Sequence, residues 1–195
     1  MADEKPSRIT ELDVLKAVSN PLRMRIYRAL STARTATASQ LAEEVDEAVS
    51  LVSYHLRRLA ATGIIGEAER QSADGRERWW QLASQGLSFR GDDFRDAPER
   101  AAAHMAFARL VESQRHEAHG RFLDEQAAWG QEWRDASFDA EYLARLTAAE
   151  LDEFGTELNA LAKRWTDRAH AAQDAGDTEG RENVAIHLYG FPFRH

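Results

Sequence analysis

The chain combines two kinds of hydrophobic pattern. Apolar residues at helical spacing predict helices over Ile9–Val18, from Pro21 past Leu30, over Ser39–Val45 and over residues 49–62. Two short runs downstream, Ile64–Arg70 and Glu77–Leu82, are typical of strands. Asp74-Gly75 between these runs is a strong hairpin signal, and the link 33–38 is a candidate third strand. The N-terminal part is therefore predicted to contain four helices and a small sheet.

The C-terminal part follows a boundary at Ser84–Pro98, which contains glycines, a proline and mixed polarity. A long helix, at most briefly interrupted, is predicted from Ala97 to about Asp135. Alternation over Ser137–Leu146 and again over Asn183–Phe191 predicts two strands. Between them, Thr147 and Glu150 form a capping box that begins a helix ending near Ala175. The second part is thus predicted to be a long helix and a small strand-helix-strand unit.

The helix over residues 49–62 has two distinct faces. Its inward stripe is predicted to consist of Val49, Val52, Leu56 and Leu59. Roughly opposite lie Ser50, Tyr54, Arg57 and Ala61, with Arg58 beside them. Short polar groups can reach base edges in a DNA major groove, and arginines can reach phosphates. The alternative is an ordinary solvated face, so the flanking segments decide between the two interpretations.

The flanking segments complete a winged helix-turn-helix. The short helix before the turn begins at a predicted capping box of Thr37 and Gln40, and residues 46–48 form the turn. The hairpin after residue 63 forms a wing over residues 70–78, whose tip places an arginine near an adjacent minor groove. The predicted DNA-binding residues are Ser50, Ser53, Tyr54, His55, Arg57, Arg58, Arg70, Arg76 and Arg78.

These residues have different predicted roles. Ser50, Ser53, Tyr54 and Arg57 are the candidates for reading base edges, and Arg58 contacts phosphate. Arg76 is expected to enter the minor groove. His55 lies nearer the buried stripe, so either a structural role or a phosphate contact is expected for it. The arginines of the second helix, Arg23, Arg25 and Arg28, are either solvated or paired side chains or auxiliary phosphate contacts.

The segment from about Ile9 to Gln85 resembles the ArsR-type winged-helix transcriptional regulators. The resemblance rests on Ala17-Val-Ser-Asn-Pro-Leu-Arg-Met-Arg-Ile26, Gln40-Leu-Ala, Ser53-Tyr-His-Leu-Arg-Arg-Leu59 and Gly63-Ile-Ile. This resemblance covers a little under half of the chain. The C-terminal part of the chain is similar, more weakly, to actinobacterial members of the family that have an appended α+β unit. The resemblance implies a bacterial, DNA-binding homodimer in which the helix after the wing forms the dimer interface.

Two departures from the family pattern change what it implies. Ala48 stands where the family usually places a serine or threonine, so Asp46 or Glu47 would have to cap the helix over residues 49–62 if any side chain does. The cysteine-bearing motif of the metal-sensing members is absent from residues 38–45. The chain contains no cysteine at all, which excludes disulfides, thiolate metal sites and thiol redox sensing.

Charge is divided unevenly along the chain, whose net charge is −8. Residues 1–90 contain 13 Lys/Arg and 12 Asp/Glu, a net of +1, whereas residues 91–195 contain 12 and 21, a net of −9. The N-terminal part can therefore carry a local basic patch, and the C-terminal part is not a DNA surface. Because the start is charged and no run of 18 apolar residues occurs, neither a signal peptide nor a membrane anchor is expected, and the chain is predicted to be cytoplasmic.

Other candidate sites have weaker patterns. The aromatic residues Phe122, Trp129, Trp133, Phe138, Tyr142 and Trp165 either form an effector pocket or belong to an ordinary core. His116 and His119 share a helix face, but no carboxylate-rich partner segment has metal-ligand spacing, so surface histidines are expected and no metal or cofactor is predicted. No nucleophile–base pair or phosphate loop is evident, and an enzyme is not expected.

The pattern as a whole predicts an α+β, mostly α fold. Residues 1–8 are expected to be disordered, 9–90 to form the DNA-binding domain, and 97–195 to form a dimerisation and effector-binding region. The leading hypothesis is a homodimeric repressor that reads a palindromic double-stranded operator and binds no membrane. One alternative is a protein-interaction adaptor that does not bind DNA. Another is a sensor that releases the operator when a small-molecule effector binds the aromatic residues.

Overall fold

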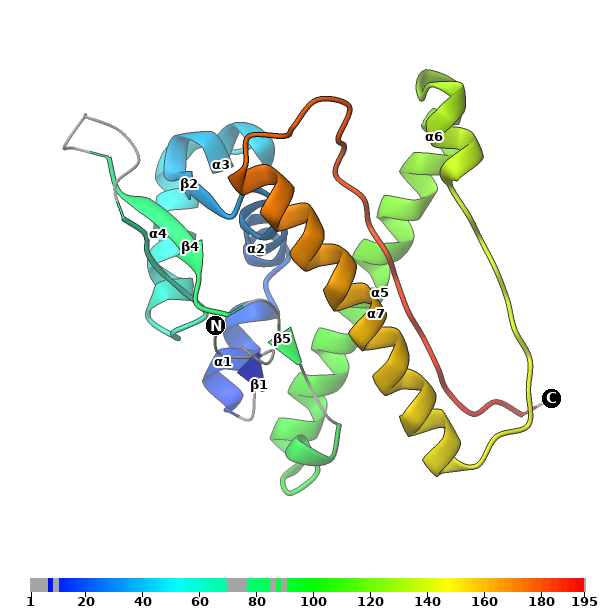
Figure 1. Cartoon of the computed structure of the whole chain (residues 1–195). Coiled ribbons are helices and arrows are strands. Elements are labelled where there is room, and N and C mark those ends of the chain that lie inside the picture. Colours follow the sequence, from blue (N-terminus) through cyan, green and yellow to red (C-terminus); the bar gives the residue numbers. More distant parts are fainter. Residues whose placement is uncertain (1–6, 9–10, 70–76, 85–86, 89–90, 195) are drawn as a thin grey trace. The chain divides into compact units, whose positions relative to one another are not determined.

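The computed structural model describes residues 7–8, 11–69, 77–84, 87–88 and 91–194. Contacts along the chain separate two units, Met1–Arg121 and Phe122–His195 (Figure 1). The first unit contains a small sheet and most of the buried residues, and the second is built around one long helix. The α+β, mostly α fold class is confirmed.

Four short helices form the N-terminal part of the first unit, as predicted: α1 (Leu12–Val18), α2 (Pro21–Ala33), α3 (Ala38–Glu44) and α4 (Val49–Ala60). Asn20 caps α2, because its side chain accepts a hydrogen bond from the Arg23 amide at 3.0 Å, and Pro21 occupies the first helical position. At α3, Thr37 and Gln40 form the predicted capping box. Gly63, with a φ of 73°, adopts the left-handed conformation after α4.

A three-stranded antiparallel sheet completes the winged-helix fold. Its order is β2 (Thr35–Thr37), β4 (Trp79–Leu82) and β3 (Ile65–Glu67), so the link after α2 is the third strand. Trp80 on the central strand is buried and Trp79 is half-buried, as alternation requires. The predicted hairpin tip at Asp74-Gly75 lies outside the described residues.

A second, two-stranded sheet pairs β1 (Ser7–Arg8) in parallel with β5 (Leu87–Ser88). Ser7 and Arg8, at the end of the segment expected to be disordered, thus have a backbone partner far along the sequence. Residues 1–6 lie outside the described part of the chain.

The core of the first unit joins all four short helices to the sheet. Its fully buried members include Leu15, Ile26, Leu30, Leu41, Leu56 and Leu59. The segment after the sheet adds to this core. Phe94 of the 3₁₀-helix η1 (Gly91–Phe94) is fully buried, and Phe107 of α5 (Pro98–Glu125) is 95% buried. The Gln114 amide also donates to the Pro21 carbonyl at 3.1 Å. The first part of α5 is thus anchored on the winged-helix core.

The second unit contains the end of α5 and two further helices. The 3₁₀-helix η2 (Gln126–Ala128) and Gly130 separate α5 from α6 (Gln131–Ala136), so the long helix is interrupted once, as predicted. The helix α7 (Ala148–Asp174) begins at the predicted capping box of Thr147 and Glu150. Gly176, with a φ of 75°, follows its end.

The two strands predicted beside α7 are absent. Residues 137–147 and 181–194 form neither helix nor strand. None of residues 138–146 takes part in a backbone–backbone hydrogen bond. Alternation makes a segment suited to a strand, but a strand forms only where another backbone pairs with it, and a single chain supplies no such partner here.

Candidate nucleic-acid interface

The turn between α3 and α4 is held by hydrogen bonds from both sides. The Glu47 amide donates to the Ala42 carbonyl at 3.0 Å, and Asp46 adopts a left-handed conformation with a φ of 50°. Aspartate is among the residues that tolerate this conformation best. From α2, Arg25 donates to the Val45 carbonyl and lies 3.5 Å from the Glu47 carboxylate. These contacts fix α4 relative to α2 and α3, so Arg25 has the paired role that was one of its two predicted roles.

The start of α4 has no side-chain cap. Ala48 is the N-cap residue, and no side chain accepts a hydrogen bond there. Neither Asp46 nor Glu47 caps the helix, because the left-handed turn and the ion pair with Arg25 direct these carboxylates elsewhere.

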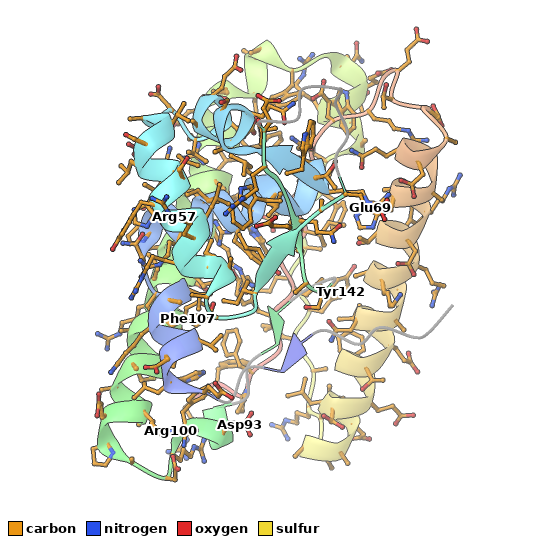
Figure 2. All side chains as sticks on the ribbon, turned by 90° about the vertical axis from the view of Figure 1, so that its left-hand side faces the viewer. Arg57, Glu69, Asp93, Arg100, Phe107 and Tyr142 are labelled. Atoms are coloured by element: carbon orange, nitrogen blue, oxygen red, sulfur yellow. The ribbon has the colours of Figure 1, made fainter. Side chains whose placement is uncertain are left out.

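The outward face of α4 carries the residues predicted for it. Ser50, Tyr54, Arg57 and Arg58 are exposed, and Arg57 extends outward from α4 in Figure 2. Ser53 is half-buried at the edge of this face. Val52, Leu56 and Leu59 are fully buried, as predicted.

Two apolar residues of α4 differ from the prediction. Val49 was placed in the inward stripe, but 46% of it is exposed, because the first residue of the helix extends past the edge of the core. Leu51 is 40% exposed and lies three residues before Tyr54, so it belongs to the outward face. The spacing of Leu51 from Tyr54 and Arg58 was the signal that could have identified it.

Arg57 and Arg58 are available to a ligand. They are the basic residues between Leu12 and Glu67 whose side chains form neither a hydrogen bond nor an ion pair within the described chain. Their neighbours are engaged: Lys16 pairs with Glu99 at 2.8 Å, and Arg23 donates to the carbonyls of Ala17 and Lys16. Within residues 12–67, the unpaired positive charge therefore lies at the C-terminal end of α4.

Arg23 supports this end of α4 from the neighbouring helix. Its two hydrogen bonds close the C-terminus of α1, which is a structural role. Burial lowers the pKa of the Arg23 guanidinium, and the positive charge of Arg58 lowers it further. Arg23 and Arg58 therefore repel each other, and a bound anion would lower the electrostatic energy of this pair.

His55 is buried under the outward face. Burial lowers the pKa of its imidazole below the ordinary value of 6.5, and the charge of Arg23 lowers it further, so His55 is neutral at pH 7. The Tyr54 ring packs edge-on against it, with centroids 5.2 Å apart and an interplanar angle of 71°. Burial and neutrality favour the structural role of His55 over a phosphate contact.

The wing is described only at its base. There Arg78 forms an ion pair with Glu67 at 3.2 Å, and its guanidinium lies 5.6 Å from the centre of the Trp80 ring. These contacts hold Arg78 across the β3–β4 pair. Arg70 and Arg76 lie outside the described residues.

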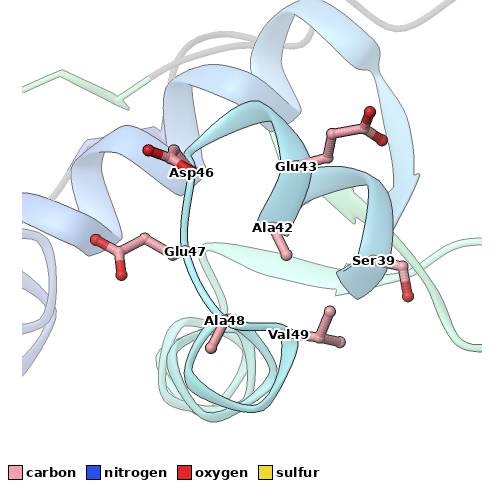
Figure 3. A pocket seen from close by; sticks show the side chains of 7 residues that line it. All are labelled: Ser39, Ala42, Glu43, Asp46, Glu47, Ala48 and Val49. Carbon is pink, nitrogen blue, oxygen red and sulfur yellow. The ribbon is translucent and has the colours of Figure 1, made fainter.

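A shallow, open depression of about 510 Å³ lies at the turn, beside the start of α4 (Figure 3). It is lined by Ser39, Ala42, Glu43, Asp46, Glu47, Ala48 and Val49. Three of these residues are carboxylates, which are drawn around the turn in Figure 3. Negative charge therefore lies beside the first turn of α4, and positive charge at its last turn.

The aromatic residues considered as an effector pocket lie in the second unit. The rings of Trp129 and Trp133 pack edge to face with centroids 6.4 Å apart, and Phe122 is half-buried. Phe138 is 81% exposed and Tyr142 is 89% exposed. Trp165 is also exposed, and the Arg168 guanidinium lies over its ring at 5.1 Å. The single chain does not enclose these six side chains in one cavity.

Metal-ligating side chains do not gather in the part of the chain that the structure describes: no group of three or more His, Cys, Asp or Glu residues there could hold a metal ion. His116 and His119 are both exposed on α5. No helix among the described residues is long and apolar enough to cross a membrane.

The fold and the exposed face of α4 define a winged helix-turn-helix domain. A family described as a helix-turn-helix domain matches residues 18–66, which span the end of α1 to β3. No curated protein sequence matches the chain significantly. Two solved structures are similar to it, a mutant of ZitR from Lactococcus lactis and its apo form. They share 17% and 13% identity, cover 74% and 77% of this chain and 73% and 85% of theirs, and have TM-scores of 0.30 and 0.31. TM-scores this low do not indicate a shared overall arrangement.

Proposed function

We propose that the chain is a sequence-specific regulator of transcription that binds double-stranded DNA as a homodimer and represses from a palindromic operator. The observation that carries this proposal is the pair of exposed arginines, Arg57 and Arg58, on a helix that a helix-turn-helix fold presents outward. Such a helix enters the major groove, and a two-fold dimer presents two of them to successive grooves. The role is one of binding rather than catalysis, exercised in a bacterial cytoplasm.

Each residue of the interface has a proposed role. Ser50, Ser53, Tyr54 and Arg57 contact base edges, and Leu51 adds an apolar contact of the kind that recognises a thymine methyl group. Arg58 contacts phosphate, with Arg23 behind it. The wing is proposed to place Arg76 in the adjacent minor groove, with Arg70 and Arg78 at its sides. Residues 9–90 form the DNA-binding domain in this proposal, and residues 97–195 the dimerisation and effector-binding region.

The net charge of −8 does not oppose this function. Phosphate contacts depend on charge within about 8–10 Å at physiological salt, the distance over which ions screen it. The basic end of α4 lies in the first unit, whereas most of the excess acidic residues follow residue 91. The acidic turn beside the start of α4 leaves the last turn as the part of the helix that attracts phosphate.

Binding of the full-length protein to its own promoter region and to scrambled DNA, measured by fluorescence anisotropy at two salt concentrations, tests the function. We expect tighter binding to the promoter, and weaker binding to both DNAs at higher salt. Equal and negligible binding to both DNAs would instead require a genome-wide DNA selection. A selection that enriches no sequence would overturn the regulator and favour an adaptor, for which the exposed Val49, Leu51 and Tyr54 would be the contact surface.

A ligand-responsive form of this function would use the aromatic residues of the second unit. Because Phe138 and Tyr142 are open to solvent in the single chain, an effector would need a further surface to enclose it.

A further inference from the structure

The buried ionisable side chain of α4 is His55. It is 8% exposed, whereas Tyr54, Arg57 and Arg58 on the same helix face solvent. Its Nδ1 atom is buried and has no hydrogen-bond partner among the residues that the structure describes. A neutral imidazole can leave one ring nitrogen as a bare acceptor, whereas protonation turns Nδ1 into a donor that requires an acceptor. The interior of the free protein therefore favours the neutral form of His55.

The imidazole of His55 lies among charged side chains from α2 and from the turn before α4. Arg23 of α2 and Glu47 of the turn act on it in opposite directions, and the effect of Arg23 is the larger. Arg25 lies 3.5 Å from the Glu47 carboxylate and weakens its effect. Arg58, three residues after His55 on α4, in turn repels Arg23. A proton on His55 would thus add a third positive charge to Arg23 and Arg58.

The other elements that pack against α4 contribute less to the charge state of His55. These elements include α1, α3 and β3. Their charged side chains are exposed or paired: Asp13, Lys16, Glu43, Glu44 and Glu67. Arg23 and Glu47 are therefore the charges that act most strongly on the imidazole in the free protein.

We propose that His55 takes up a proton when the operator binds, so that the affinity for DNA rises in mildly acidic conditions. This inference rests on the proposed function, in which Arg58 contacts a phosphate with Arg23 behind it. A phosphate at that position brings negative charge to the same group of cations. It offsets the repulsion from Arg23 and so favours the protonated form of His55. Because binding linkage is reciprocal, a proton on His55 favours the bound phosphate by the same factor.

The sign and the pH range follow from the charge state of the free protein. Burial and the charge of Arg23 lower the pKa of His55 below 6.5, so the free protein binds this proton only in acid. The bound phosphate raises this pKa, so the complex holds more protons than the free protein and the affinity increases as pH falls. A rise of about one pKa unit gives a gain of up to about tenfold in affinity. The gain should shrink at high salt, which screens the phosphate charge.

Fluorescence anisotropy of the full-length protein on promoter and scrambled DNA, from pH 5.5 to pH 8 at constant ionic strength, tests the proposal. The wild type is expected to bind promoter DNA up to about tenfold more tightly at pH 5.5 than at pH 8. The variant His55→Gln has a neutral side chain at every pH and should lose most of this response. His116→Gln, which removes an exposed histidine from α5, is the matched control and should keep it. Far-UV circular dichroism at each pH checks that the proteins are folded.

NMR of the wild-type imidazole gives a second measurement that does not depend on a variant. The pKa of His55 should lie below 6.5 in the free protein and about one unit higher in the complex with DNA. An equal pKa in both states would overturn the proposal, and so would a pH response of His55→Gln equal to that of the wild type. A purely structural His55 gives that second result, with a less stable variant. Failure of the proposed function differs from both, because the wild type would then bind no DNA selectively at any pH.

Discussion

Replacing the two free arginines of α4 one at a time separates base recognition from phosphate contact. Arg57 and Arg58 are exposed and make no ion pair, so Arg57→Ala and Arg58→Ala should change the free energy of unfolding by less than about 0.5 kcal/mol. Their effects on DNA binding should be larger and should differ in kind. Arg57→Ala should cost about 1–3 kcal/mol on the operator, or roughly 5- to 150-fold in affinity, if Arg57 reads a guanine.

Arg58→Ala should instead weaken binding to every DNA sequence by a similar factor. One lost phosphate contact lowers the slope of log affinity against log salt concentration by about 0.9. The change in this slope reports the number of phosphate contacts directly, so it measures the contribution of Arg58 better than the affinity alone does.

Anisotropy titrations of both variants on promoter and scrambled DNA, over a series of salt concentrations, give the two quantities. Arg109→Ala removes another exposed arginine, from α5, and controls for net charge. If Arg57→Ala weakens binding equally on both DNAs, Arg57 contacts phosphate and not bases. If neither arginine variant differs from Arg109→Ala, the proposed orientation of α4 in the groove is incorrect.

Three further predictions concern the fold that presents α4. The imidazole of His55 has a lowered pKa in the folded state, so protonation favours the unfolded state and the free energy of unfolding should fall as pH drops below 6.5. Urea titrations at pH 5 and pH 7 measure this loss, and the variant His55→Gln should show a smaller one. Truncation of a fully buried side chain by Leu56→Ala should cost about 2–5 kcal/mol of unfolding free energy, whereas Leu51→Ala on the exposed face should cost well under 1 kcal/mol; equal losses would contradict the assignment of the two faces. Thr37→Ala removes the capping box of α3 and should lower the free energy of unfolding by about 1 kcal/mol in chemical denaturation. Thr32→Ala, which changes an exposed threonine near the end of α2, should not reproduce this loss.

Local signals in the sequence were sufficient for the helices and their boundaries. Thr37 with Gln40, Thr147 with Glu150, and Pro21 after Asn20 each specify a helix start through contacts within three residues, and the structure has all of them. The outward face of α4 was likewise predictable from the helical period, except at Val49, where the limit of the core depends on tertiary packing.

Contacts between distant segments were not predictable in this way. Phe94 stacks on His104 at 5.3 Å and is buried in the core, and Gln114 reaches the carbonyl of Pro21, yet no local pattern links these positions. Alternation over residues 137–146 indicated a strand because it reports which side chains share a face. It does not report whether a backbone partner exists, and within one chain this segment has none.

The missing cap at Ala48 has a thermodynamic consequence for recognition. A helix whose N-cap is alanine forgoes about 1 kcal/mol relative to one capped by serine or aspartate, so its first turn is the part that unwinds most easily. DNA that accepts hydrogen bonds from the amides of this turn would complete its folding, and the entropy lost there would be part of the binding free energy. Only a DNA sequence that forms contacts with the ordered turn offsets this loss of entropy. The ratio of the affinities for operator and random DNA would then depend partly on helix formation. The variant Ala48→Ser would lower this ratio, because it folds the first turn of α4 before DNA binds.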